Sequence, residues 1–166
     1  MRLEPTVERL IQYAAQGDTS AVQLMLQAGV KVTDADPLRK VTALHNAAAQ
    51  GHVALVKLLI EHGADVNATD WQGVTPLIAA SFYGRLDVAR VLLEKGATVD
   101  VRPAGGPTAL IAATYNDNPK LVELLLASGA NPSQADAFGN TAKAVAETTK
   151  RPAILAVLAD KAGVAP

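Results

Sequence analysis

The sequence predicts an all-α repeat protein, a solenoid in which helix–turn–helix units stack on one another. A motif that begins with threonine recurs at Thr42, Thr75, Thr108 and Thr141, with the same spacing each time. Each period also holds two short patterns of apolar residues with helical spacing. A fixed period of this kind is typical of repeat proteins, because one such unit cannot bury its apolar faces without neighbours.

A second motif repeats with the same period at the other end of each unit. It reads His-Gly-Ala-Asp-Val-Asn at 62–67, Lys-Gly-Ala-Thr-Val-Asp at 95–100 and Ser-Gly-Ala-Asn-Pro-Ser at 128–133. A weaker copy, Ala-Gly-Val at 28–30, precedes the first of these by one position more than the regular interval. We therefore place one inserted residue at about 36–41.

The copy that begins at Thr75 shows how one unit is expected to fold. Thr75 supplies the hydroxyl that caps a helix, and Pro76 follows where a missing N–H is tolerated. Gly84 separates this helix from a second one, which Gly96 ends in the left-handed conformation. Before the unit, Asp-Trp-Gln-Gly at 70–73 predicts a β-turn, with Asp at its first position and Gly at its last.

These motifs resemble the ankyrin repeat along the whole chain. The family pattern is a turn, Thr-Pro-Leu-His, a helix, Gly-His, a second helix and Gly-Ala-Asp-Val-Asn, and it is matched closely at 42–67 and 75–100. The match is moderate at 108–133, where Asp117 replaces the glycine between the helices and Pro119 follows. The resemblance implies an ankyrin solenoid whose units carry β-turn or hairpin fingers.

The resemblance also gives the domain organisation, a single ankyrin-repeat domain over 1–166. We expect an N-terminal capping repeat at 1–36, inner repeats at 37–69, 70–102 and 103–135, and a C-terminal capping repeat at 136–166. Lys143 stands where the inner repeats have a leucine, as expected if that face of the last unit meets solvent.

Composition limits the partners. The 166 residues carry 15 Lys and Arg against 16 Asp and Glu, a formal net charge of -1, so neither nucleic acid nor an anionic membrane is expected as a partner. No apolar run approaches the ~20 residues that cross a bilayer, and the N-terminus lacks the apolar core of a signal peptide. We expect a monomer in the cytoplasm. Export is the alternative if a leader peptide was removed from the sequence.

The three histidines are candidates for catalytic or metal-binding residues. His45, His52 and His62 fall within one short stretch of the chain. The ankyrin pattern favours histidine at the positions of His45 and His52, for hydrogen bonds between turns, and His62 lies at a variable helix end. We therefore expect no catalytic residue, no metal site and no cofactor.

A glycine-rich stretch and several aspartates have structural explanations too. Ala-Gly-Gly-Pro at 104–107 lacks the Gly-Lys-Ser/Thr ending of a phosphate loop and is interpreted as a remodelled finger turn. Asp65, Asp70 and Asp100 stand at turn positions, where an aspartate bonds the backbone nearby. The sequence predicts that the protein is not an enzyme.

The candidate site consists of aromatic residues. Five of the six fall at positions that the ankyrin pattern leaves variable and that line the concave face and fingers in that family: Trp71, Phe82, Tyr83, Tyr115 and Phe138. Adjacent residues of a helix point about 100° apart, so Phe82 and Tyr83 cannot both face one core. Arg39, Gln50 and Asn116 are expected to form a basic and polar rim. Alternatively, one of the two adjacent aromatics packs against the second helix, and bulky turn residues pack on neighbouring fingers.

The leading functional hypothesis is a non-enzymatic module that binds a partner protein through its concave face and fingers, as an inhibitor or regulator of a partner enzyme. The alternative is a scaffold, an adaptor or a self-associating protein. An engineered binder is a third hypothesis, but the unequal inner copies favour natural drift.

Overall fold

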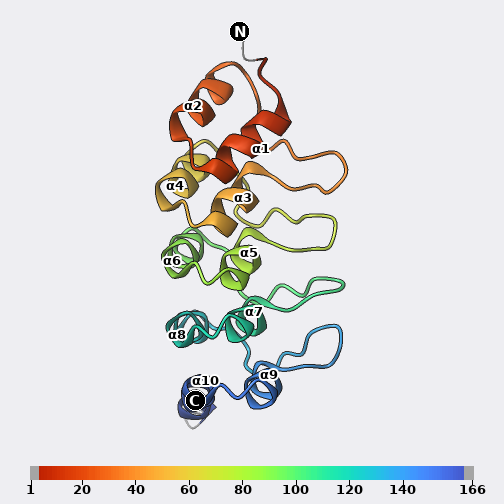
Figure 1. Cartoon of the computed structure of the whole chain (residues 1–166), viewed down its shortest axis with the longest axis vertical. Helices are drawn as coiled ribbons and strands as arrows, with labels where there is room; N and C mark the ends of the chain where they lie inside the picture. The colour runs from red at the N-terminus through yellow and green to blue at the C-terminus, as the bar shows by residue number, and fades with distance from the viewer. Residues whose placement is uncertain (1–3, 163–166) are drawn as a thin grey trace.

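The computed structural model describes residues 4–162, which form two rows of helices with all long loops on one side (Figure 1). The first helices of the units form one row: α1 (Val7–Gln16), α3 (Ala43–Gln50), α5 (Pro76–Phe82), α7 (Ala109–Tyr115) and α9 (Ala142–Thr148). The second helices form the other: α2 (Thr19–Gln27), α4 (Val53–Glu61), α6 (Leu86–Glu94), α8 (Pro119–Ala127) and α10 (Pro152–Ala162). The all-α repeat fold predicted from the sequence is confirmed.

The core is a strip that runs the length of the stack. Each first helix packs on the first helices of the adjacent units, and the second helices α4, α6, α8 and α10 pack in the same way. The first helices bury small residues, which let their backbones approach: Ala43, Ala47, Ala48, Ala80, Ala109, Ala112, Ala113, Ala142 and Ala146. The second helices bury mainly larger ones: Leu55, Val56, Leu59, Val88, Leu92, Leu121, Leu125 and Ile154. Each such side chain stabilises the fold by about 1.5–3 kcal/mol relative to an exposed one.

The recurring threonines begin the first helices, as predicted. The hydroxyls of Thr42, Thr75, Thr108 and Thr141 each accept a hydrogen bond from the backbone N–H three residues further on. This bond satisfies one of the N–H groups that a helix leaves without an internal partner. The period of the sequence is therefore the period of helix starts.

A column of polar side chains joins neighbouring units at the turn between the two helices. Its members are His52, Arg85, Asn118 and Arg151, which occupy equivalent positions of successive units. The first three hydrogen-bond main-chain carbonyls of the preceding unit, those of Ala15 at 3.1 Å, Ala49 at 2.9 Å and Gly84 at 3.3 Å. Arg151 instead pairs with the carboxylate of Asp117 at 2.7 Å. The column therefore covers the carbonyl ends of the first helices, which carry partial negative charge.

The fingers contain the predicted turn but not hairpin strands. Gly73 N–H donates to the Asp70 carbonyl at 3.0 Å, which closes the β-turn expected at 70–73. Within residues 4–162, however, the β-pairing is limited to one isolated antiparallel bridge, between Ala35 and Thr42. In the first, second and fourth fingers a single backbone hydrogen bond of this kind joins the two arms, such as Asp70 N–H to the Val74 carbonyl at 3.0 Å, and no ladder forms.

Candidate protein-binding site

The five aromatic residues singled out in the sequence are all exposed. The exposed fraction is 62% for Trp71, 51% for Phe82, 52% for Tyr83, 44% for Tyr115 and 77% for Phe138. Phe82 and Tyr83 lie at the end of α5 with their rings edge to face, 5.3 Å apart between centroids. About half of each side chain is exposed, so neither ring is buried in the core.

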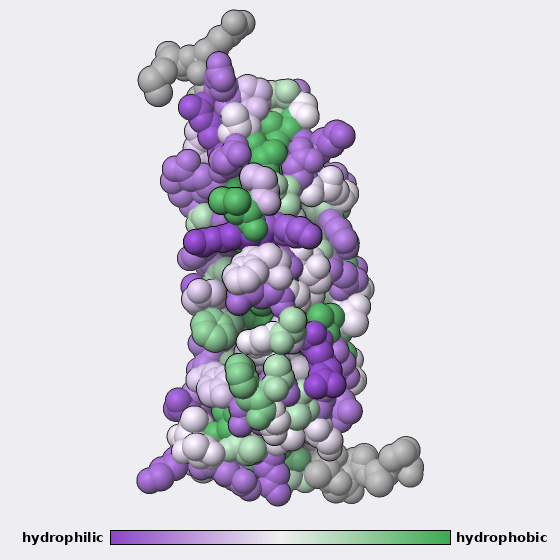
Figure 2. All heavy atoms as spheres, turned by 90° about the vertical axis from the view of Figure 1, so that its right-hand side faces the viewer, coloured by the Kyte–Doolittle hydropathy of each residue, from purple (hydrophilic) through white to green (hydrophobic). Residues whose placement is uncertain are grey.

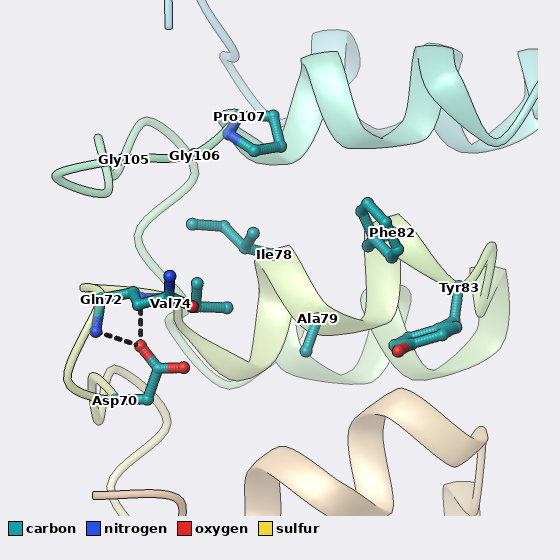
Figure 3. Close-up of a pocket in the computed structure, with 10 residues that line it drawn as sticks. All are labelled: Asp70, Gln72, Val74, Ile78, Ala79, Phe82, Tyr83, Gly105, Gly106 and Pro107. Carbon is teal, nitrogen blue, oxygen red and sulfur yellow. Dashed lines mark hydrogen bonds between the residues drawn. The ribbon is translucent and has the colours of Figure 1, made fainter. Parts of the chain in front are cut away.

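A cavity of about 370 Å³ lies beside α5, between the second and third fingers (Figure 3). Val74, Ile78 and Phe82 supply its apolar wall, and Gly106 and Pro107 of the third finger line the opposite side. Asp70 and Gln72 stand at the finger end of the cavity, and Tyr83 stands at the other end. The cavity therefore joins the adjacent aromatic pair to the base of the second finger.

The remaining aromatic residues do not line this cavity. Trp71 and Phe138 lie in the loops of the second and fourth fingers, and Tyr115 is the last residue of α7. The view onto the finger tips shows hydrophobic side chains in separate groups, with hydrophilic ones between them (Figure 2). Only Phe82 and Tyr83 share the cavity.

The fingers are tied to one another by backbone hydrogen bonds. Trp71 N–H donates to the Arg39 carbonyl at 3.0 Å, and Ala104 N–H donates to the Gln72 carbonyl at 3.1 Å. Leu38, at the tip of the first finger, is 86% exposed. The repeat pattern does not identify Leu38 as a surface residue, because the inserted residue shifts this finger out of register with the others. Lys40 accommodates the insertion at φ 54°, in the region that Gly73 and Gly139 take in the second and fourth fingers.

The polar rim residues differ from one another in their surroundings. Arg39 and Gln50 are exposed. Asn116 is also exposed, but its side-chain amide donates to the Phe82 carbonyl at 3.1 Å, and the side chain lies against Gly84. Its amide therefore helps to hold α5 and α7 together, beside the aromatic residues.

Aspartates organise the finger turns. Asp70 Oδ1 accepts the N–H groups of Gln72 and Val74, each at 2.9 Å (Figure 3). Asp136 makes the same turn in the fourth finger. Burial there raises its pKa, but the backbone and side-chain hydrogen bonds from Asn140 and the backbone bond from Phe138 together outweigh burial and leave the pKa lowered.

His45 lies behind the finger bases, in the core. Burial lowers the pKa of His45 from 6.5, although its hydrogen bond to Val74 and the charge of Asp70 oppose the shift. Nδ1 accepts the Thr42 N–H at 3.2 Å, and Nε2 donates to the Val74 carbonyl at 3.0 Å. Both nitrogens of the neutral ring thus have hydrogen-bond partners. At neutral pH the ring carries no positive charge that would neutralise the negative charge of Asp70.

The other histidines also bond the backbone. His52 contacts the Ala15 carbonyl at 3.1 Å, as the resemblance implied, and exposed His62 contacts the Leu58 carbonyl at 2.9 Å. In the part of the chain that the structure describes, no three His, Asp or Glu residues cluster as metal ligands would. No helix over the same residues has the length and hydropathy to span a membrane.

The stacked units and the exposed aromatic residues define a helical repeat protein of the kind that binds other proteins. The chain belongs to the ankyrin-repeat family: the family model "Ankyrin repeats (3 copies)" matches residues 10–103, and "Ankyrin repeat" matches residues 105–137. Ankyrin repeats are protein–protein interaction modules.

Several characterised proteins are similar over part of the chain. Ankyrin repeat and SOCS box protein 6 of Mus musculus is 39% identical over 37% of this chain and 15% of its own length. The 2-5A-dependent ribonuclease of Mus musculus is 38% identical over 42% of this chain and 9% of its own length. An ankyrin repeat-containing protein of Schizosaccharomyces pombe is 39% identical over 39% of this chain and 30% of its own length. The matches thus cover less than a third of each of these relatives, and only one of their names, that of the ribonuclease, gives an activity.

Proposed function

We propose that this protein binds a partner protein through its concave face, the surface between the first helices and the fingers. The central contacts are Trp71, Phe82, Tyr83 and Tyr115, with Phe138 at one end and Arg39, Gln50 and Asn116 around them. The observation that carries this proposal is the exposure of all five aromatic residues, between 44% and 77%. Exposed aromatic side chains bury large areas at little entropic cost and dominate the energy of protein interfaces.

The protein acts by binding rather than by catalysis. The histidine rings are used in backbone hydrogen bonds, and the finger aspartates hold their own turns. A net charge of -1 favours a protein partner over nucleic acid or an anionic membrane. On its own the protein is a monomer.

A partner held across this face has part of its own surface covered, so the module acts as an inhibitor or regulator when that partner is an enzyme. The alternative is a scaffold or adaptor that leaves its partner active, or a protein that associates with itself. The adaptor is favoured by exposed aromatic residues both in the middle of the stack, at Phe82 and Tyr83, and in its last finger, at Phe138.

The test is a pull-down from the native cell extract, followed by mass spectrometry of the captured proteins. The unaltered protein is compared with the triple variant Trp71→Ala, Phe82→Ala, Tyr115→Ala, whose folding is first checked by circular dichroism. We expect a partner captured only by the unaltered protein. Equal capture by both proteins would contradict the proposed site.

Stoichiometry and activity then separate the two functions. An inhibitor forms a one-to-one complex in which the partner enzyme loses activity, whereas an adaptor leaves the partner active. A mass above 17.2 kDa for the purified protein, measured by light scattering, would show self-association instead.

A further inference from the structure

We propose that the cavity beside α5 receives a basic side chain, lysine or arginine, from the partner protein, with its cationic head at Asp70. The proposal rests on the protein-binding function proposed above and specifies the chemistry of one contact. The aliphatic stem lies against the wall of Val74, Ile78 and Phe82, and the head reaches the free oxygen of the Asp70 carboxylate.

The charge of the cavity comes from one residue. Asp70 is the only charged residue among those that line it. Its Oδ1 is occupied by the N–H groups of Gln72 and Val74, each at 2.9 Å, whereas no hydrogen bond from the described residues reaches Oδ2. Figure 3 shows the second oxygen turned away from these two bonds. One carboxylate oxygen thus remains for a ligand.

No residue in the described part of the chain forms an ion pair with Asp70. Among the described residues the ion pairs are Lys143 with Glu147 and Arg151 with Asp117, both far along the chain from this finger. His45, whose ring is close enough to be influenced by Asp70, is neutral because burial lowers its pKa. A cation from a partner therefore completes the electrostatics of the site.

The shape of the cavity fits a long side chain with an apolar stem. α5 is 7 residues long, so the cavity wall extends over about 10 Å between Asp70 and the aromatic pair. Lysine and arginine bury aliphatic stems on apolar surface while their heads reach a polar group. The volume of the cavity, about 370 Å³, is near the lower end of the range for small-molecule sites. This volume leaves room for one such side chain and part of its backbone.

Two glycines that line the cavity are not needed for the backbone. Gly105 and Gly106 line it, and neither has the positive φ found at Gly73 in the preceding finger. A Cβ built on Gly105 would meet no described atom within 4 Å, and one on Gly106 would meet only Pro103, at 3.8 Å. The fold therefore has room for a Cβ at both positions, so neither glycine is required by its backbone conformation or by a close neighbour.

The experiment is an NMR titration of the purified ¹⁵N-labelled protein with amino-acid probes at millimolar concentration. The probes are the N-acetyl methylamides of lysine, arginine, norleucine and glutamate. We expect saturable shifts of the Val74, Gly105 and Gly106 amides, with the basic probes binding at least about threefold tighter than norleucine and the preference shrinking at high salt.

Two variants and one control locate the effect. Asp70→Asn keeps the oxygen that accepts the two backbone bonds and removes the charge, so the preference for basic probes should disappear. Ala79→Leu fills the cavity from the half-buried side of α5 and should abolish binding of all probes. Asp65→Asn removes one exposed carboxylate that makes a similar turn bond to Asn67, and should leave the titration unchanged.

Three results would overturn the proposal: equal binding of lysine and norleucine probes, tighter binding of the glutamate probe, or no shift at these amides with any probe. Thermal unfolding of each variant shows that it is folded before it is titrated. Because the titration needs no natural partner, its failure leaves the pull-down result standing, and a failed pull-down leaves the titration standing.

Discussion

Arg85 Nε donates a hydrogen bond of 2.9 Å to the main-chain carbonyl of Ala49, across the boundary between two units. The arginine stem also lies over Gly51, where a Cβ would come within 3.0 Å of Arg85 Cδ. Gly51 has φ 87°, a backbone conformation that favours glycine. The Arg85 stem and the backbone conformation therefore both favour a residue without a side chain at position 51. Units of this solenoid are thus joined by polar contacts at the turns as well as by their apolar strip.

Replacing this arginine should weaken the stack. We expect Arg85→Ala to lower the free energy of unfolding by about 1–2 kcal/mol, because the carbonyl end of α3 loses a charged donor. Arg85→His, the residue found one unit earlier at His52, should recover part of the loss. Urea unfolding followed by circular dichroism measures both. Arg90→Ala, at an exposed position of α6, is the control and should change stability by less than about 0.5 kcal/mol.

The buried histidine should make stability depend on pH. Because the pKa of His45 is lowered from 6.5 in the folded protein, the unfolded chain binds more protons just below that pH. The contribution of His45 is therefore fully present above pH 6.5 and is lost as the pH falls toward the lowered value. We expect the melting temperature of the protein to fall as the pH is lowered below 6.5.

The variant His45→Ile isolates this effect, since isoleucine occupies the equivalent positions 78 and 111. It should flatten the pH dependence of the melting temperature between about pH 7 and pH 5. The same fall in the variant as in the unaltered protein would show that another group is responsible. Asp136, whose pKa is lowered from 3.8, acts only at more acidic pH.

The glycines of the third finger should be replaceable. Gly105→Ala and Gly106→Ala are each expected to raise the free energy of unfolding by about 0.4–1 kcal/mol, because they restrict the unfolded chain without straining the folded one. Gly73→Ala in the second finger is the contrasting variant. It should destabilise the protein, because Gly73 has φ 83° and its Cβ would lie 3.3 Å from Pro103 Cα. Denaturant midpoints distinguish the two cases.

The helix caps should contribute individually. Thr75→Ala removes the hydroxyl that accepts the Ile78 N–H at 3.3 Å, and we expect a loss of about 1 kcal/mol in the free energy of unfolding. Thr75→Ser keeps the oxygen and should retain most of that stability. Thr69→Ala, at an exposed position of the same finger, serves as the control for loss of a threonine. Equal destabilisation by Ala and Ser at position 75 would show that the buried methyl group, not the cap, matters.

The sequence alone determined the solenoid, the helix starts and the exposure of the aromatic residues. Its constant period places Thr75 and Thr108 at equivalent positions, and a local hydrogen bond to the N–H three residues on makes each a helix start. Adjacent helical residues cannot both face one core, which predicts that one of Phe82 and Tyr83 lies at the surface, and the ankyrin pattern places both at variable positions.

The tertiary structure alone decided what the variable residues do. Asn116 was expected in a partner-facing rim, yet its amide bonds the carbonyl of Phe82 in the preceding unit. The cavity needs Asp70 from one finger and Gly106 from the next, and a periodic sequence does not show which side chains face the space between two units. Helix caps and the repeat period depend on residues close together in the sequence. A cavity between two units depends instead on how the loops of those units pack against each other.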